Sequence, residues 1–263
     1  MRYARGSFVI TDERDVPLLR QIRNSRFVSH QQLFELLQYE AFVSSRGTFN
    51  WRIHRLLKTQ HIERVDALTW QGSPVYSITP NGLIELESHG EFAVALHSRT
   101  RKMPDRVQVF HALELNVIRL TLARNGLLVS WRSEIEISSN NMVSIAPYQK
   151  DYDAIVKIWI GNEVREFALE YERSLKSAKQ YQRIHAALEA ERQIGCVLYL
   201  TADPDLLLAL FYQLTPISKR LGFATARSFR EQLLATSVTT DASGNFVTLQ
   251  TFLQYAHPLY MGA

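Results

Sequence analysis

The chain has 263 residues, of which 46% are hydrophobic and 21% are charged. These proportions exclude wholesale disorder, and the length allows two modest domains or one large one. The longest uninterrupted apolar run, 206–212, is far shorter than the roughly 20 residues that span a membrane. The first residues lack the apolar stretch of a signal peptide, and the single cysteine, Cys196, excludes an internal disulfide and a cysteine-based zinc ribbon. We therefore expect a soluble, cytoplasmic protein with no membrane partner.

The net charge of +4 is unevenly distributed along the chain. Residues 1–102 carry 14 Lys and Arg against 10 Asp and Glu, whereas the remaining residues carry 16 of each. Within the first part, the segment 46–64 holds five basic residues and one acid. Such clustering is typical of a surface that binds a polyanion. On charge alone, a solvated helix face explains it equally well.

Hydrophobic periodicity and capping residues define the elements of the first part of the chain. In chain order we expect three helices, two strands and a further helix, over residues 11–26, 29–37, 48–60, 62–70, 74–79 and 79–90. Three helices followed by a hairpin is the order of a winged helix-turn-helix domain, in which the third helix enters the DNA major groove.

The third predicted helix has two distinct faces. A core stripe is formed by Phe49, Ile53, Leu56 and Leu57. The remaining positions are polar, basic or aromatic, and together with the start of the basic segment they supply the candidate DNA-binding residues: Arg46, Asn50, Trp51, Arg52, His54, Arg55 and Lys58. Arg and Lys suit guanine or phosphate, and Asn suits adenine or phosphate. A domain that only docks a protein is the alternative, but composition and face together favour double-stranded DNA as the partner.

A short polar and basic segment, 96–104, ends at a proline and predicts a domain boundary. It separates a winged-helix DNA-binding domain, 1–95, from a second domain, 105–263. The cations of this linker either follow a phosphate backbone or are simply solvated.

The second domain is predicted to be α/β. In chain order we expect a helix, four strand-like runs, a helix, a strand and a helix, over residues 105–125, 127–131, 134–137, 153–160, 164–172, 175–193, 196–201 and 203–214. Gly161-Asn162 is a hairpin signal, and the apolar run 196–201 indicates a buried parallel strand. The order therefore predicts helices around a mixed sheet.

Three carboxylates gather on the central predicted hairpin. Asp153 begins one strand, while Glu170 and Glu172 are two residues apart and so share one face of the other. Carboxylates on adjacent strands can hold a hard divalent cation such as Mg²⁺ or Mn²⁺, which polarises a phosphodiester and activates water. Ordinary exposed acids at a sheet edge are the alternative.

Asp153, 16 intervening residues and then Glu170-x-Glu172, on a hairpin followed by a helix, resemble the PD-(D/E)xK nuclease core. With the preceding winged helix and the sequence His-Ala-Leu-Glu-Leu-Asn at 111–116, the chain resembles the replication-relaxation family of plasmid proteins, which includes MobC-type relaxases. This resemblance covers about residues 12–215. It implies a restriction-endonuclease-like second domain and a metal-dependent relaxase that nicks one strand at a plasmid origin of transfer, alongside accessory mobilisation proteins.

By this resemblance Asp153 and Glu170 are metal ligands. Glu172 stands where the nuclease core has a lysine that orients the attacking water, so it is either an extra ligand or a sign that the site is inactive.

Other residues could complete the predicted site. Lys176, Lys179 or Lys157 could replace the missing lysine. Glu114 could add a metal ligand, and His111 could act as a base or contact phosphate, although a lone histidine on a helix is more often packed or solvated.

Two functions therefore remain open from the sequence. One is a metal-dependent nicking enzyme of plasmid mobilisation. The other is a DNA-binding regulator of transcription or replication whose nuclease-like domain is inactive. The missing lysine favours the regulator. The three acids favour the enzyme, because their mutual repulsion costs stability without a cation. The sequence leaves the oligomeric state open.

Overall fold

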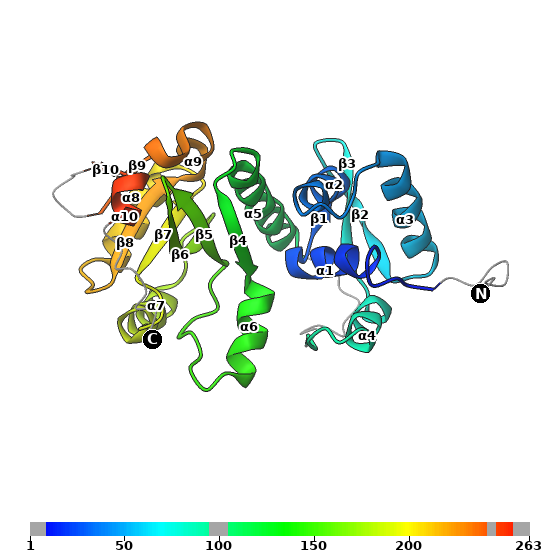
Figure 1. Ribbon diagram of the computed structural model, residues 1–263. Coiled ribbons are helices and arrows are strands. Elements are labelled where there is room, and N and C mark those ends of the chain that lie inside the picture. Colours follow the sequence, from blue (N-terminus) through cyan, green and yellow to red (C-terminus); the bar gives the residue numbers. More distant parts are fainter. Residues whose placement is uncertain (1–8, 95–104, 241–245, 255–263) are drawn as a thin grey trace. The chain divides into compact units, whose positions relative to one another are not determined.

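The protein is described by a computed structural model that covers residues 9–94, 105–240 and 246–254. The chain is mixed α/β and forms two compact units, Met1–Asn116 and Val117–Ala263. Figure 1 labels the elements of each unit. No helix in the described ranges is both long and apolar enough to cross a lipid bilayer.

The two units divide within α5 (Arg106–Arg124) rather than at the predicted linker. That linker, 96–104, lies outside the described residues. The first half of α5 belongs to the N-terminal unit because Val109 and Leu113 complete its core with Val65 and Val75. Gln32 also donates a hydrogen bond to the Leu113 carbonyl at 2.9 Å.

The N-terminal unit has the predicted order of helices and strands. Its elements before α5 are α1 (Val16–Ser25), β1 (Val28–Ser29), α2 (His30–Tyr39), α3 (Arg46–Lys58), β2 (Ile62–Trp70), β3 (Ser73–Ile78) and α4 (Pro80–Ser88). The strands form an antiparallel sheet in the order β1-β3-β2, in which the short strand β1 was not predicted.

Local capping explains where these helices begin. Ser29 caps α2 as predicted, since its hydroxyl accepts from the Gln32 N–H and the Gln32 side chain accepts from the Ser29 N–H. The prediction that the first helix begins at Thr11 is wrong. The N–H and hydroxyl of Thr11 both donate to the Asp15 carboxylate, which closes a turn, and α1 begins only at Val16.

The C-terminal unit is built on a mixed sheet, as predicted. After α5 its elements are β4 (Leu128–Ser133), α6 (Glu134–Val143), β5 (Ala154–Ile160), β6 (Glu163–Glu172), α7 (Ala178–Ala190), β7 (Cys196–Thr201), α8 (Pro204–Leu214), β8 (Arg220–Thr225), α9 (Ala226–Gln232), the 3₁₀ turn η1 (Leu233–Ala235), β9 (Ser237–Thr239), β10 (Phe246–Thr248) and α10 (Leu249–Gln254). The strand order is β10-β9-β8-β7-β6-β5-β4. Strand β7 runs parallel to both of its neighbours, and the other pairs are antiparallel.

One predicted strand of this unit is a helix. Residues 134–137 begin α6, because the N–H and hydroxyl of Ser133 donate to the Glu136 carboxylate at 2.8 Å each and form a capping box. Ile137 of this helix is fully buried.

Helices cover both faces of the sheet. On one face, residues of α6, α7 and α8 pack in a core around Ala168, Val197 and Phe223. On the other, α10 approaches β8 so closely that a Cβ on Gly222 would lie 2.8 Å from the Phe252 ring. The face covered by α6, α7 and α8 is the one that also carries the predicted carboxylates.

Candidate functional site

The buried face of α3 is formed by the predicted core stripe. Phe49, Ile53 and Leu56 are at most 3% exposed, and Leu57 is half-buried. Ser45 caps this helix. The apolar period therefore fixes how α3 is rotated on its unit, and with it which side chains face outward.

Six of the seven predicted DNA-binding residues lie on the outward side of α3. Arg46, Asn50, Trp51, His54 and Lys58 are exposed, and Arg55 is half-buried. Trp51 is 53% exposed, and the Arg55 guanidinium carbon lies 4.3 Å from the centroid of its ring. The Arg55 guanidinium therefore stacks on one face of a tryptophan that is largely exposed to solvent.

Arg52 is the exception, and its assignment as a DNA contact is wrong. The side chain is 8% exposed and donates a hydrogen bond to Asp15 at 2.7 Å. Position 52 is three residues after Phe49 and four before Leu56, which places it at the edge of the core stripe. That spacing was the signal for a structural role.

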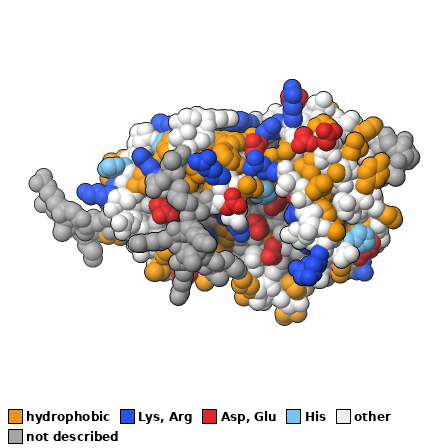
Figure 2. Space-filling view, turned by 180° about the vertical axis from the view of Figure 1, so that it is seen from behind, with side chains coloured by type: hydrophobic (Ala, Val, Ile, Leu, Met, Phe, Trp, Pro, Cys, Tyr) orange, Lys and Arg blue, Asp and Glu red, His pale blue; other side chains and the backbone are white. Residues whose placement is uncertain are grey.

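One face of the molecule carries charged side chains of both signs. On the face shown in Figure 2, acidic, basic and hydrophobic side chains are interspersed.

The three predicted carboxylates, which we call the acidic cluster (Asp153, Glu170 and Glu172), lie in the C-terminal unit. Glu170 and Glu172 are on β6, and Asp153 directly precedes the neighbouring strand β5, which begins at Ala154. The pairing of Ala154 with Leu169 sets Asp153 opposite Glu170. Glu170 and Glu172 are 3% and 5% exposed. An oxygen of Asp153 accepts a hydrogen bond from the Tyr171 N–H at 2.7 Å. The alternative that these are exposed edge acids is therefore wrong for both glutamates.

Two lysines enter the acidic cluster. Lys150 forms an ion pair with Glu170, and Lys176 forms one with Glu172. The sequence predicted Lys176 as a candidate cation but missed Lys150. The available signal for Lys150 was a basic residue three positions before Asp153, in a segment with no regular pattern.

No ion pair with the acidic cluster is recorded for the other candidates in the described residues. Lys157 pairs with Glu166 at 3.2 Å, and Lys179 is exposed on α7. His111 and Glu114 are half-buried on the first half of α5 and belong to the N-terminal unit, whereas the acidic cluster belongs to the C-terminal unit.

Burial dominates the electrostatics of the cluster. It raises the pKa of Glu170 to about 7, against the opposing effect of the Lys150 ammonium. Burial lowers the pKa of Lys150, but the carboxylates of Glu170 and Asp153 outweigh it and the net pKa is raised. The cluster therefore holds a charged lysine beside a carboxyl that titrates near neutral pH.

A buried tyrosine faces the same cluster. Tyr199 lies opposite Glu170 in the parallel pair β6–β7, so both side chains point to one face of the sheet. Its hydroxyl is buried with no hydrogen-bond partner in the described part of the chain. Burial and the carboxylates of Glu170 and Glu172 raise the pKa of this hydroxyl, so it stays a donor.

The oxygens of Asp153 and Glu170 suit a hard cation, and the Tyr199 hydroxyl is an unsatisfied donor beside them. In the described ranges, however, no three His, Cys, Asp or Glu side chains are arranged to hold a metal ion. The ammonium groups of Lys150 and Lys176 neutralise two of the three acids. Repulsion remains within the cluster, since the Asp153 carboxylate contributes to the raised pKa of Glu170.

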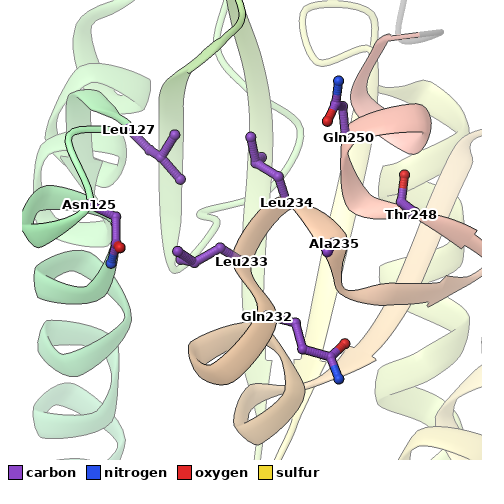
Figure 3. A pocket seen from close by; sticks show the side chains of 8 residues that line it. All are labelled: Asn125, Leu127, Gln232, Leu233, Leu234, Ala235, Thr248 and Gln250. Atoms are coloured by element: carbon purple, nitrogen blue, oxygen red, sulfur yellow. The ribbon is translucent and has the colours of Figure 1, made fainter.

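The C-terminal unit also has an open pocket of about 460 Å³, and no residue of the acidic cluster lines it. Figure 3 shows the side chains that line it, namely Asn125, Leu127, Gln232, Leu233, Leu234, Ala235, Thr248 and Gln250. None of them titrates near neutral pH, so this pocket offers no acid–base chemistry.

Comparison of the chain with protein-family models, with curated proteins and with solved structures gave no match. The resemblance to the replication-relaxation family therefore stays a prediction.

Proposed function

We propose that this protein binds double-stranded DNA through α3 of a winged helix-turn-helix unit and cleaves it with a metal-dependent, PD-(D/E)xK-like C-terminal unit. The order of three helices followed by a hairpin supports the winged helix. The exposed Asn50 and Lys58 and the half-buried Arg55 support groove reading, because they present amide and cationic donors on one side of α3.

The observation that carries the nuclease proposal is the meeting of acids and lysines on one sheet face. Asp153 and Glu170 come from antiparallel neighbours, and Lys150 joins Glu170 from the preceding loop. A phosphodiester hydrolase needs oxygen ligands for a metal ion and a cation for the phosphate. Lys150 and Lys176 supply the cation that the motif position of Glu172 lacks.

In this proposal Asp153 and Glu170 hold Mg²⁺ or Mn²⁺, which when bound polarises the scissile phosphate. Lys176 and Lys150 stabilise negative charge on the phosphate oxygens, since both are within ion-pair reach of the cluster.

The biological setting of the proposal comes from the family resemblance. It is the nicking of one strand at a plasmid origin of transfer by a cytoplasmic relaxase, together with accessory mobilisation proteins.

A second function is favoured by one specific observation. Lys150 and Lys176 pair with Glu170 and Glu172, so two of the three acids have a counter-ion without a metal ion. A non-catalytic DNA-binding regulator of transcription or replication would retain α3 and use the C-terminal unit for dimerisation or docking.

Melting curves with and without Mg²⁺ or Mn²⁺ test the metal site, because a ligand that binds only the folded state raises its stability. Asp153→Asn is the sharpest variant, since an amide oxygen can still accept from the Tyr171 N–H. Glu166→Gln is the matched control, because Glu166 is an acid of β6 that pairs with Lys157 of β5 and is not part of the acidic cluster.

We expect metal to raise the melting temperature of the parent and of Glu166→Gln, but not of Asp153→Asn. Nicking of supercoiled plasmid should follow the same pattern. An equal rise in all three proteins would show that Asp153 is not a ligand. DNA binding without nicking at saturating metal would instead favour the regulator.

A further inference from the structure

A chain of hydrogen bonds joins β3, α2 and α3 in the N-terminal unit. The Tyr76 hydroxyl lies 3.1 Å from Nδ1 of His30, and Nε2 of His30 lies 3.0 Å from Oδ1 of Asn50. Asn50 is exposed on α3, whereas Tyr76 is 1% exposed. The chain therefore runs from the core of the unit to the surface proposed to meet DNA.

Aromatic packing holds the middle of this chain. The ring centroid of His30 lies 4.9 Å from that of Phe49 and 5.9 Å from that of Tyr76. Both neighbours are fixed in the core, since Phe49 is fully buried. The orientation of the imidazole is thus set by side chains that do not reach the surface.

The protonation of His30 sets the direction of the hydrogen bonds. Burial lowers its pKa, the bond to Asn50 raises it, and the nearby cations Arg46 of α3 and Arg64 of β2 lower it, with a net decrease. The ring is therefore neutral at pH 7 and carries one N–H. Because Oδ1 of Asn50 only accepts, Nε2 carries that hydrogen, and Nδ1 accepts from the Tyr76 hydroxyl.

This direction decides what Asn50 presents outward. One lone pair of its Oδ1 accepts the hydrogen bond from His30. The second lone pair and the two Nδ2 hydrogens take no part in the hydrogen bonds that join Tyr76, His30 and Asn50. Adenine offers an N7 acceptor and an N6 donor in the major groove, which an oriented Asn reads with one donor and one acceptor. A phosphate offers acceptors alone and would need no fixed carbonyl.

We infer that His30 is a positioning residue that orients the Asn50 amide to read an adenine in the major groove. The inference rests on the proposed DNA binding by α3 and assigns the base that one position of this helix recognises. Tyr76 supports it by fixing the tautomer of His30.

The first test needs no DNA. Long-range ¹⁵N–¹H correlation spectra of the full-length protein at pH 7 report which ring nitrogen of His30 is protonated. We expect the Nε2–H tautomer, and we expect Tyr76→Phe to shift the population toward Nδ1–H. A parent ring protonated on Nδ1, or on both nitrogens, would overturn the inference.

The second test selects binding sites from a randomised DNA duplex library with the parent, Asn50→Ala, His30→Phe and Tyr76→Phe. His89→Phe is the control, because this histidine of the same unit pairs with Asp12 and Glu85. We expect the parent to prefer adenine over the other bases at one position of its site. In Asn50→Ala and His30→Phe this preference should fall by at least about fivefold. All other positions and the His89→Phe site should be unchanged.

The outcomes separate the two proposals. If the parent enriches no common sequence, sequence-specific binding by α3 fails and the adenine assignment fails with it. If the parent site contains the adenine and both His30→Phe and Tyr76→Phe keep its preference, DNA binding stands and the positioning role alone is wrong. Should His30→Phe fail to melt cooperatively, Tyr76→Phe decides, because it removes only one hydroxyl.

Discussion

Arg52 of α3 donates a hydrogen bond from Nη1 to Oδ1 of Asp15, the residue before α1, over a distance of 2.7 Å. Both side chains are buried. The pair joins residues 37 positions apart and fixes the third helix against the first. It also removes one arginine from the surface of a helix on which Arg46 and Lys58 are exposed.

We expect Arg52→Ala to destabilise the protein by about 3–5 kcal/mol, because it leaves the Asp15 carboxylate buried without its counter-ion. Urea unfolding of the full chain measures this loss. Arg55→Ala, on the same helix but half-buried, should cost less than about 1 kcal/mol. If Arg52→Ala were as mild as Arg55→Ala, the Asp15–Arg52 pair would not anchor α3.

DNA binding should depend on the outward cations instead. We expect the double variant Arg55→Ala, Lys58→Ala to weaken binding to a DNA duplex and to reduce the slope of log K against log salt by about 2, one unit for each lost phosphate contact. Fluorescence anisotropy over a salt series measures both quantities. The control is Arg227→Ala, an exposed arginine of the C-terminal unit that pairs with Glu231. An unchanged slope in the double variant would remove α3 from the interface.

The raised pKa of Glu170 predicts a pH-dependent stability. The folded state holds the proton more tightly than the unfolded chain, whose glutamates titrate near 4.5. The stabilisation is therefore complete below pH 4.5 and is lost as the pH rises through about 7. This group should lower the free energy of unfolding on the order of 3 kcal/mol over that window.

Urea titrations of the parent and Glu170→Gln between pH 4.5 and 8 measure this contribution, because the amide cannot ionise. We expect the stability difference between the two proteins to vary with pH. Glu166→Gln serves as the control and should run parallel to the parent. A pH-independent difference for Glu170→Gln would mean that Glu170 titrates alike in both states.

Close packing at the start of α4 predicts a second loss of stability. A Cβ on Gly82 would lie 2.2 Å from the His61 carbonyl oxygen and 2.7 Å from the Ile78 side chain. We expect Gly82→Ala to cost about 1–3 kcal/mol or more, since the backbone must shift. Gly47→Ala is matched to it in the first turn of α3, where the added Cβ meets only Ser45 at 3.8 Å. Thermal melting should show that Gly47→Ala is neutral or stabilising.

Most of the order of the elements up to Leu214 was determined by the amino-acid sequence, because apolar period, caps and turns act locally. The short strand β1 and the elements after α8 were not predicted. Ser29 capped the predicted helix, and the Gly161 turn joined the predicted hairpin of β5 and β6. The prediction failed at 134–137, where the alternation of Ile135 and Ile137 resembled a strand. The Ser133 capping box decides for a helix there.

Only the tertiary structure decided which charged groups are available and which are paired. Periodicity placed Arg52 beside the other cations of α3, yet its partner is Asp15 of a different segment. Strand alternation placed Asp153, Glu170 and Glu172 together, but not Lys150, which reaches Glu170 from an irregular loop. Long charged side chains pair with groups that are close in space. Burial strengthens this tendency, because a desolvated charge without a partner costs free energy. Neither the distance between two charged groups in space nor the desolvation of a buried charge can be read from the spacing of residues along one element.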